Sequence, residues 1–424
     1  MIPALDSRRA RVAAALPLGD ALLVITAGEP IPLPEGSDQH YPFRAHAEYY
    51  YLAGLECPGA VLAYDPRDGA AGWVSFVPVV TEGERVWEGR VQPPGRPLAD
   101  FAGWLAARRG RSIAQLGAHF PGVTADKELS QRVRAAFTHA RRVKDAAELA
   151  LLREAVAATE RGFAIIPGLL RAGLTERALQ IELEAEFFRG GATGTGYHSL
   201  VGSGPNSAVL HCEPGSRTMS DGELVLIDAG AELDRYTADV TRTYACGTPS
   251  AFQRDLYQAV LTAQERASAR CVAGAEWKAI HLATAVDLMA GLVAMGVMRG
   301  RPETLVEQEA HTLFFPHGLG HMVGLGVRDA SGLAPGRTPD ARASLRTLRM
   351  DLPLAPGYVV TVEPGLYFIP PLLNDPVRRE RHRDSVNWPL VEQHLQTGGV
   401  RIEDNLLITE GAPENLTAGI AKQL

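Results

Sequence analysis

The clearest pattern of apolar and polar residues in the chain predicts a β-hairpin. The apolar run Leu224–Gly230 is followed by alternation of inward and outward positions over Tyr236–Tyr244. An apolar run, a short polar turn and a segment of period two are typical of adjacent antiparallel strands. The predicted hairpin carries two aspartates, one on each side of the turn.

The position of the turn decides how Asp228 and Asp239 face each other. A turn at Leu233-Asp234 puts them directly opposite, and a turn at Asp234-Arg235 makes them diagonal neighbours. Side chains alternate with period two, so both registers place the two carboxylates on one face. Like charges so close repel unless one is protonated or a cation lies between them. The pair therefore suggests a metal site, and an exposed aspartate beside a turn cap is the structural alternative.

Residues 1–140 are predicted to form a separate α/β domain. The aromatic run Tyr49–Tyr51 is expected to be a half-buried strand, and a binding lip is the alternative. Clusters of proline, glycine and charged residues separate the other elements. Strands are expected at 21–27, 60–64 and 73–79, and a helix at 99–108.

A second domain is predicted over residues 141–424, and it begins with a basic boundary segment at 141–145. Thr175 has the position of a helix N-cap. Because hairpin strands and long helices are mixed in this half, we expect an α+β fold. Helices are expected at 146–163, 175–189, 251–272 and 278–296.

The composition restricts the class of protein. The 424 residues are 46% hydrophobic and 21% charged, with a formal net charge of −7, as in globular proteins. No basic stripe is present, so nucleic acid is not an expected partner. No apolar run approaches the 18 residues of a membrane span, so no membrane partner is expected. Four scattered cysteines and an N-terminal segment that fits a signal peptide poorly predict a cytoplasmic location.

Further candidate ligands lie downstream of the helices. His317 and His321 are four residues apart in a glycine-rich segment that indicates a loop. Glu363 and Glu403 lie in mainly apolar strands, where an unpaired carboxylate is rare. Two aspartates, one histidine and two glutamates suit Mn, Co, Zn or Fe(II) in a site for two metal ions. Such ions make hydroxide available at neutral pH, and a nearby glutamate can accept and return the proton.

The order of these motifs resembles the metal signature of the creatinase/methionine aminopeptidase superfamily. The aspartates lie in I-D-A-G and A-D-V-T-R-T, the histidine in H-G-L-G-H, and the glutamates in V-E-P-G and R-I-E-D. The resemblance covers residues 145–410 and favours the Xaa-Pro branch, prolidase and aminopeptidase P. Residues 368–373 resemble bacterial prolidase, whereas residues 41–54 resemble aminopeptidase P. The implied architecture is α+β, with a pita-bread catalytic domain and a smaller creatinase-like α/β domain for substrate contact or dimerisation.

The resemblance also implies a role for each matching residue. The implied metal ligands are Asp228, Asp239, His321, Glu363 and Glu403, and Glu363 is also the implied general base. The other implied roles belong to the catalytic residues His211 and His317, the pocket residues Tyr197 and Tyr367, Arg401 beside the ligands, and Arg349 at the product-side carboxylate. Two divalent metal ions, Mn before Co, Zn or Fe, are the implied cofactors. Short proline-containing peptides and a second copy of the chain are the implied partners.

One position departs from the Xaa-Pro pattern. Where these enzymes have a further histidine in V-H-D, this chain has Arg328 in V-R-D. Arginine is permanently charged and binds carboxylates in a bidentate manner. We therefore expect Arg328, together with Arg349, to bind a terminal carboxylate. In the structural alternative, Arg328 turns away and pairs with Asp329 or another acid.

The leading functional prediction is a prolidase-like Xaa-Pro dipeptidase. The alternatives are a proline-specific metallocarboxypeptidase, which anchors the substrate C-terminus through Arg328 and Arg349, and an Xaa-Pro aminopeptidase (aminopeptidase P). The N-terminal domain disfavours a methionine aminopeptidase, and the complete ligand set disfavours creatine hydrolysis. A non-catalytic pita-bread module that binds proteins is a remote alternative, because such relatives have lost ligands.

Overall fold

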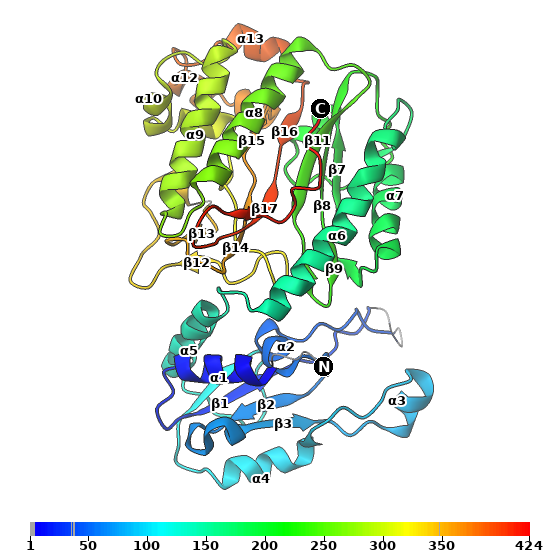
Figure 1. Cartoon of the computed structure of the whole chain (residues 1–424), viewed down its shortest axis with the longest axis vertical. Coiled ribbons are helices and arrows are strands. Elements are labelled where there is room, and N and C mark those ends of the chain that lie inside the picture. The colour runs from blue at the N-terminus through cyan, green and yellow to red at the C-terminus, as the bar shows by residue number, and fades with distance from the viewer. Residues whose placement is uncertain (1–4, 35, 37–38, 347) are drawn as a thin grey trace. The chain divides into compact units, whose positions relative to one another are not determined.

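The computed structural model describes residues 5–34, 36, 39–346 and 348–424. The chain divides into two compact units, Met1–Arg141 and Arg142–Leu424. Figure 1 colours the first from blue to cyan and the second from teal to red.

The first unit is built on a five-stranded sheet in the order β4-β3-β2-β1-β5. β1 runs parallel to β5 and β3 parallel to β4, and the other neighbours are antiparallel. β1, β2 and β3 confirm the three strands predicted here. The strands are β1 (Leu22–Thr26), β2 (Val61–Tyr64), β3 (Trp73–Val77), β4 (Arg96–Pro97) and β5 (Ile113–Leu116). The helices are α1 (Leu5–Ala15), α2 (Ala47–Ala53), α3 (Glu82–Trp87), α4 (Phe101–Ala106) and α5 (Lys127–Ala140).

The prediction of a strand at Tyr49–Tyr51 is wrong, because these residues lie in helix α2. Tyr49 and Tyr51 are fully buried, and the Tyr51 ring meets the Phe137 ring of α5 edge-on at 5.8 Å. Gly54 ends the helix in the left-handed conformation, with φ 69°. Three consecutive buried aromatic residues carry no period that separates a strand from a short helix.

A buried ion pair joins two strand ends of the first unit. Asp65 follows β2 and is 3% exposed. Arg111, just before β5, donates to both of its carboxylate oxygens at 2.8 Å, and Arg108 Nε donates to Oδ2 at 2.7 Å. These arginines hold the pKa of the Asp65 carboxyl well below its usual range, the Arg111 hydrogen bonds contributing most.

The second unit contains several small sheets. Their orders are β11-β8-β7, β14-β17-β18 and β10-β9-β6, with the pairs β15-β16 and β12-β13. The strands are β6 (Gly194–Thr195), β7 (Leu200–Ser203), β8 (Glu223–Ala229), β9 (Ala231–Leu233), β10 (Tyr236–Thr237), β11 (Val240–Cys246), β12 (Gly332–Leu333), β13 (Met350–Asp351), β14 (Val359–Val362), β15 (Gly365–Tyr367), β16 (Gly399–Arg401), β17 (Asp404–Leu407) and β18 (Glu414–Asn415).

Of the two predicted hairpin registers, the structure has the one in which Asp228 and Asp239 are diagonal neighbours. β8 pairs antiparallel with β11, and Thr241 is the partner of Asp228. Asp239 precedes Thr241 by two residues, so it lies on the same face as Asp228 and diagonal to it. The turn is at Asp234-Arg235, where φ is 47° and 74°, as a two-residue turn of type I′ requires.

Capping side chains start three of the four long helices of the second unit. Asp145 with Glu148, and Ser250 with Gln253, form capping boxes at α6 and α8, and Thr175 is confirmed as the N-cap of α7. Each cap satisfies backbone N–H groups that the first helical turn leaves unpaired. The helices are α6 (Ala146–Leu169), α7 (Glu176–Arg189), α8 (Ala251–Arg270), α9 (Trp277–Ala294), α10 (Pro302–Glu307), α11 (Pro370–Leu373), α12 (Pro376–Arg381) and α13 (Trp388–Gln393).

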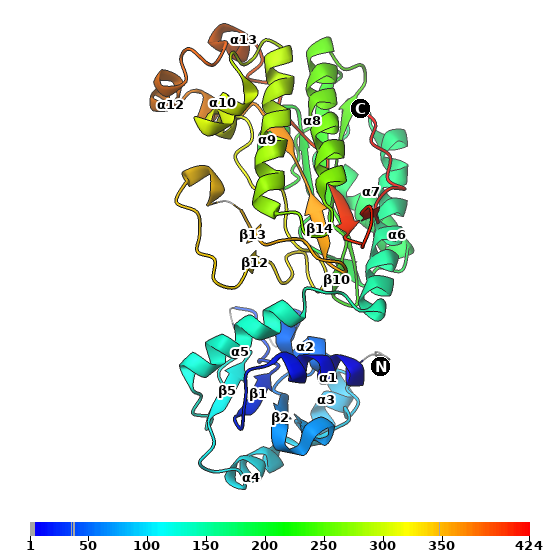
Figure 2. The same cartoon turned by 60° about the vertical axis from the view of Figure 1, so that its left-hand side comes forward.

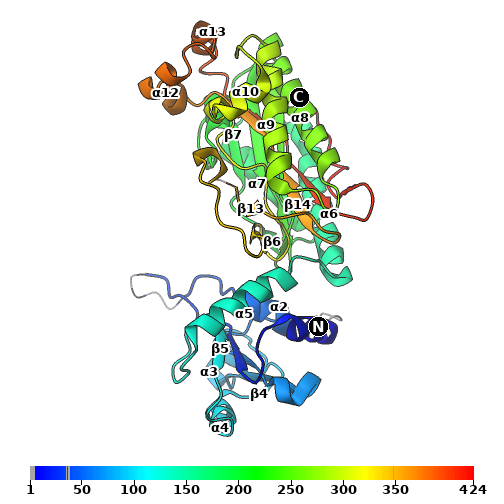
Figure 3. The ribbon, with the colours of Figure 1, turned by 90° about the vertical axis from the view of Figure 1, so that its left-hand side faces the viewer.

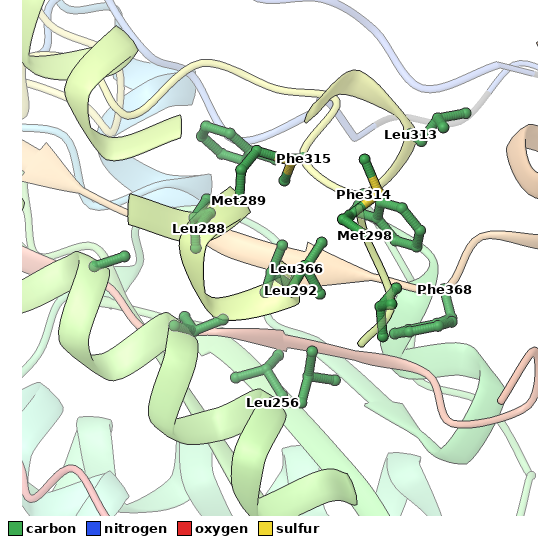
Figure 4. Close-up of a cluster of buried hydrophobic side chains, with 14 of the residues drawn as sticks. Leu256, Leu288, Met289, Leu292, Met298, Leu313, Phe314, Phe315, Leu366 and Phe368 are labelled. Carbon is green, nitrogen blue, oxygen red and sulfur yellow. The ribbon is translucent and has the colours of Figure 1, made fainter. Parts of the chain in front are cut away.

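Each pair of long helices covers its own group of strands (Figures 1 and 2). α6 and α7 share a core with β7, β8 and β11, whereas α8 and α9 pack on β15 and β16. Figure 4 shows the second core, in which Leu256 of α8 and Leu292 of α9 lie near Leu366 of β15. In the side view of Figure 3, α8 and α9 again lie together. The expected α+β architecture is confirmed.

Helix α9 is long and apolar enough to cross a membrane by length and composition alone, although the sequence analysis predicted no span. The mean hydropathy of its 18 residues is 1.3, and 44% of them are buried. Leu288, Met289 and Leu292 are fully buried in the core that α9 shares with α8. Packing inside the unit therefore accounts for this apolar surface.

Candidate metal centre

Three of the five predicted ligands form a cluster that could hold a metal ion. One ligand atom from each of Asp239, His321 and Glu403 lies within 4.8 Å of the others, and all three residues are buried. His321 Nε2 is 3.4 Å from Asp239 Oδ2 and 3.9 Å from Glu363 Oε1. Asp239 precedes β11, Glu363 follows β14 and Glu403 precedes β17. Three strand ends that are far apart in the sequence therefore meet at one point.

Hydrogen bonds between the strands fix these positions. The Glu403 N–H donates to the Thr241 carbonyl at 3.0 Å, and the Thr241 hydroxyl donates to Glu403 Oε2 at 2.6 Å. The His321 N–H donates to Thr361 Oγ1 at 3.0 Å, and the Thr361 N–H donates to the His321 carbonyl at 2.8 Å. Gly320 allows this approach, because a Cβ there would lie 2.2 Å from the Thr361 carbonyl oxygen.

His321 presents one ring nitrogen to the carboxylates. Its Nδ1 lies 3.1 Å from the Met322 carbonyl oxygen, so Nδ1 carries the proton and Nε2 is the acceptor. Burial lowers the pKa of His321, which keeps the ring neutral. A neutral imidazole with its second nitrogen hydrogen-bonded to a backbone carbonyl is the usual form of a metal-binding histidine.

Asp228 is held beside the cluster by two side chains. Arg401 Nη2 donates to Asp228 Oδ2 at 2.6 Å, and the Tyr197 hydroxyl lies 2.6 Å from both Asp228 Oδ1 and Asp239 Oδ1. A hydroxyl has one proton and can donate to one of these oxygens. The second short contact is therefore satisfied when the other carboxyl group is protonated.

The electrostatics of the site fit a donor set for cations. Burial, with the nearby Asp228 charge, raises the pKa of Asp239 to about 8. Burial and neighbouring carboxylates also raise the pKa of Glu363 and of Glu403 well above the usual range. Oxygen ligands with one imidazole suit divalent metals such as Mn, Zn or Fe. Bound cations would allow all these carboxylates to ionise together, so the residues fit a metal centre.

A chain of hydrogen bonds connects Arg401 to His317. Arg401 Nη1 donates to the Tyr367 hydroxyl at 3.0 Å, and that hydroxyl lies 2.8 Å from His317 Nε2. His317 Nδ1 lies 2.8 Å from the Gly318 carbonyl oxygen, so Nδ1 donates and Nε2 accepts from Tyr367. Burial lowers the pKa of His317 to about 3, which keeps its ring neutral.

A cavity of about 710 Å³ opens onto the carboxylates. Tyr367 does not line it: the residue is fully buried and reaches the cavity through His317. The sequence analysis placed Tyr367 in the substrate pocket, and the structure places it behind the pocket wall. The other predicted site residues all line the cavity, namely Tyr197, His211, Asp228, Asp239, His317, His321, Arg328, Arg349, Glu363, Arg401 and Glu403.

Besides Arg401, three arginines line the same cavity as the carboxylates. Arg328 and Arg349 were expected there, and Arg346 joins them. The structural alternative supposed that Arg328 pairs with Asp329. Asp329 pairs instead with Lys144, at 2.8 Å. Arg328 is exposed, and its charge acts on Asp239 from across the cavity.

Sequence reasoning missed the residues that support the ligands. Thr241, Thr361 and Asn405 hold the backbone or side chains of Glu403, His321 and Asp239. Each supporting residue lies two positions from one ligand in the sequence and holds a different ligand. Thr241 and Asn405 were visible within the A-D-V-T-R-T and R-I-E-D-N motifs. Arg346 gave no signal, because it lies in a long irregular segment.

Comparison with known proteins defines the class. Residues 150–410 match metallopeptidase family M24, and residues 5–128 match the N-terminal domain of aminopeptidase P. The chain belongs to family M24. It is a metallopeptidase of the Xaa-Pro aminopeptidase branch, in which an aminopeptidase P N-terminal domain precedes a pita-bread domain. The suspected family and fold are thereby confirmed.

Relatives and solved structures agree with this assignment. The chain is 31% identical to a probable Xaa-Pro aminopeptidase of Botryotinia fuckeliana, over 95% of this chain and 90% of that protein. It superposes on aminopeptidase PepP of Pseudomonas aeruginosa with a TM-score of 0.81 and 26% identity, covering 100% and 97% of the two chains. It superposes on Escherichia coli aminopeptidase P with the inhibitor Pro-Leu with a TM-score of 0.78 and 28% identity, covering 98% of this chain and 94% of that chain.

These comparisons favour the aminopeptidase P alternative over the leading functional prediction. A prolidase-like dipeptidase has less support than the aminopeptidase P alternative, because the matching relatives and the N-terminal domain are of the aminopeptidase P type. The prolidase-like segment at 368–373 forms helix α11 and the two residues before it, and it does not line the cavity.

Proposed function

We propose that this chain is an Xaa-Pro aminopeptidase that removes the first residue of short peptides with proline in second place. The similarity to Xaa-Pro aminopeptidases over both units supports this proposal more than any other observation. The ligands Asp228, Asp239, His321, Glu363 and Glu403 would hold two divalent metal ions, with Mn preferred. A homodimer and a cytoplasmic location stay predictions.

Glu363 has the geometry of a ligand that also transfers protons. Its Oε1 faces His321 Nε2 at 3.9 Å, and its Oε2 faces His317 Nδ1 at 3.8 Å. One oxygen can therefore serve the metal centre while the other accepts and returns a proton. Bound metal ions would supply the Lewis-acid chemistry that makes hydroxide available at neutral pH.

Two histidines at the cavity wall would bind the peptide substrate. His317 is held in one tautomer by Gly318 and Tyr367, and its ring lines the cavity. His211 is exposed at the cavity wall, where its ring can contact the peptide. Tyr197 bridges Asp228 and Asp239 and keeps the two hairpin carboxylates at a fixed separation.

Product analysis of three peptides tests the proposal. With Mn added, the enzyme should release alanine from Ala-Pro-Ala and leave N-acetyl-Ala-Pro-Ala uncut. Slow or absent cleavage of Ala-Pro would distinguish the enzyme from a dipeptidase. Cleavage of Ala-Pro alone would refute the proposal and restore the dipeptidase.

The arginines favour one second candidate, a proline-specific carboxypeptidase. Arg328, Arg346 and Arg349 line the cavity, and guanidinium groups bind terminal carboxylates in a bidentate manner. Release of the last residue from N-acetyl-Ala-Pro-Ala would establish this activity. Arg328→His should then shift the preference between free and amidated C-termini. An unchanged preference would show that Arg328 does not read the carboxylate.

A further inference from the structure

The segment that carries Arg328 is a loop closed on itself. Residues 322–331 follow the ligand His321, and the Asp329 N–H donates to the Met322 carbonyl at 3.0 Å. The Gly326 N–H donates to the hairpin turn at 2.8 Å. This second bond joins the loop to the hairpin that carries two of the ligands.

A buried ion pair anchors the base of this loop. Lys144 Nζ lies 2.8 Å from Asp329 Oδ2, and the two side chains are 0% and 1% exposed. The same carboxylate oxygen accepts from the Leu325 N–H at 3.3 Å. At Gly324 a Cβ would lie 2.4 Å from this oxygen. Glycine is therefore needed where the loop backbone meets the ion pair.

The segment before α6 holds the far end of the loop as well. Arg142 Nε donates to the Ala330 carbonyl at 3.0 Å, and Arg142 Nη2 donates to the Leu333 carbonyl at 3.2 Å. The Lys144 N–H donates to the Gly357 carbonyl at 2.9 Å. Residues 142–144 are thus fixed by backbone contacts of their own and can act as a rigid support.

Adjacent residues of the loop point to opposite environments. Asp329 is buried with Lys144, whereas Arg328 is exposed and lines the substrate cavity. Arg328 directly precedes Asp329 in the chain, so a fixed Asp329 backbone also fixes where the Arg328 side chain starts. Burying an ion pair costs solvation free energy, and such a pair is often kept for specificity rather than stability.

We propose that the Lys144–Asp329 ion pair positions the side chain of Arg328. By holding Arg328 in place, the ion pair sets how tightly the cavity binds the part of the peptide after the scissile bond. The inference rests on the proposed function, because it assigns Arg328 to substrate binding. The contacts given above join the pair to the loop backbone rather than to a ligand side chain, so the chemical step at the carboxylates should be spared.

A double-mutant cycle tests this positioning role. Asp329→Asn and Lys144→Met should each raise KM for Ala-Pro-Ala by about 10-fold and change kcat by less than about 3-fold, as for coupled contacting residues. In an Arg328→Ala background the same substitutions should have no further effect on KM. Glu414→Gln, which breaks the exposed pair of Arg153 and Glu414, is the matched control and should leave KM unchanged.

Binding of Pro-Leu, measured by calorimetry with the metal-loaded full chain, gives a second readout. The ion-pair variants should weaken Pro-Leu binding in the presence of Arg328 and not in its absence. Equal losses in both backgrounds, or a fall in kcat alone, would overturn the positioning role. If the parent enzyme cleaves no Xaa-Pro peptide, the proposed function fails, but the Pro-Leu cycle still decides the role of the ion pair. Melting temperatures show whether a variant has lost its fold. If Asp329→Asn has lost its fold, the comparison between the two Arg328 backgrounds is made with Lys144→Met alone.

Discussion

Asn405 binds the backbone of Asp239 on both sides. The Asn405 amide nitrogen donates to the Asp239 carbonyl at 2.5 Å, and Asn405 Oδ1 accepts from the Asp239 N–H at 3.0 Å. Both residues are buried, and they are 166 positions apart in the sequence. This pair joins the hairpin to the strand that follows Glu403, so it sets the distance between two of the ligands.

Asn405→Leu should therefore weaken metal binding. Loss of both hydrogen bonds leaves a buried N–H and a buried carbonyl without partners, and Asp239 can move away from Glu403. Supporting residues of metal sites contribute about 10- to 100-fold in metal affinity, and we expect a loss in that range. Titration with Mn measures it. Gln258→Ala, on the surface of α8, is the control and should bind Mn like the parent.

Asp239→Asn should abolish activity without unfolding the chain. The carboxylate is a proposed ligand, and Lewis-acid stabilisation worth several kcal/mol corresponds to a rate loss of about 1,000-fold or more. In the metal-free protein the substitution removes a buried acid that repels its neighbours, so the melting temperature should not fall. Turnover in buffer with excess Mn would contradict the assignment of this ligand.

Arg401→Lys should lower kcat by about 10- to 100-fold. The guanidinium contacts Asp228, Tyr367 and Thr241 through three different nitrogens. A lysine ammonium cannot reproduce this planar fork, so Asp228 and the Tyr367–His317 bond lose their fixed positions. Steady-state kinetics and metal analysis on the same sample show whether the loss comes from positioning or from an empty site. Kinetics equal to those of the parent would contradict this role.

Asp65→Asn should destabilise the first unit by about 3 kcal/mol at pH 7, the cost of breaking a buried ion pair. The folded pKa of Asp65 is depressed below the unfolded value of about 3.9. The contribution is therefore fully present at neutral pH and lost as the pH falls below about 4 and through the folded pKa. Denaturant unfolding of both proteins at pH 7 and at pH 3 measures the difference, which should shrink at the lower pH. A difference that is constant with pH would mean that the charge of Asp65 is not responsible.

The shared face of Asp228 and Asp239 could be predicted from the sequence because period-two alternation is a local property. Asp228 and Asp239 had to share a face in either register, and the choice between the registers depended on which two residues adopt positive φ. Aspartate tolerates that conformation, but arginine gives no such signal, so Asp234-Arg235 could not be selected in advance. The helix at Tyr49–Tyr51 was missed because burial on all sides removes the polar positions that reveal a period.

Other features depend on contacts between distant segments and leave no local pattern. The pairing of Lys144 with Asp329 joins residues 185 positions apart, and nothing near Asp329 in the sequence indicates a buried lysine. Tyr367 was placed on the pocket wall by its motif, whereas packing puts it behind His317. Arg346 reaches the cavity from an irregular segment whose path only the folded chain defines.

The stoichiometry of bound metal tests the central claim most directly. Native mass spectrometry of the metal-free chain, titrated with Mn, should show two ions per chain for the parent protein and fewer for Asp239→Asn and Glu403→Gln. The five ligands then account for a centre with two ions. A parent protein that binds no ion, or two ions retained when both Asp239 and Glu403 are replaced, would contradict the assignment of the site.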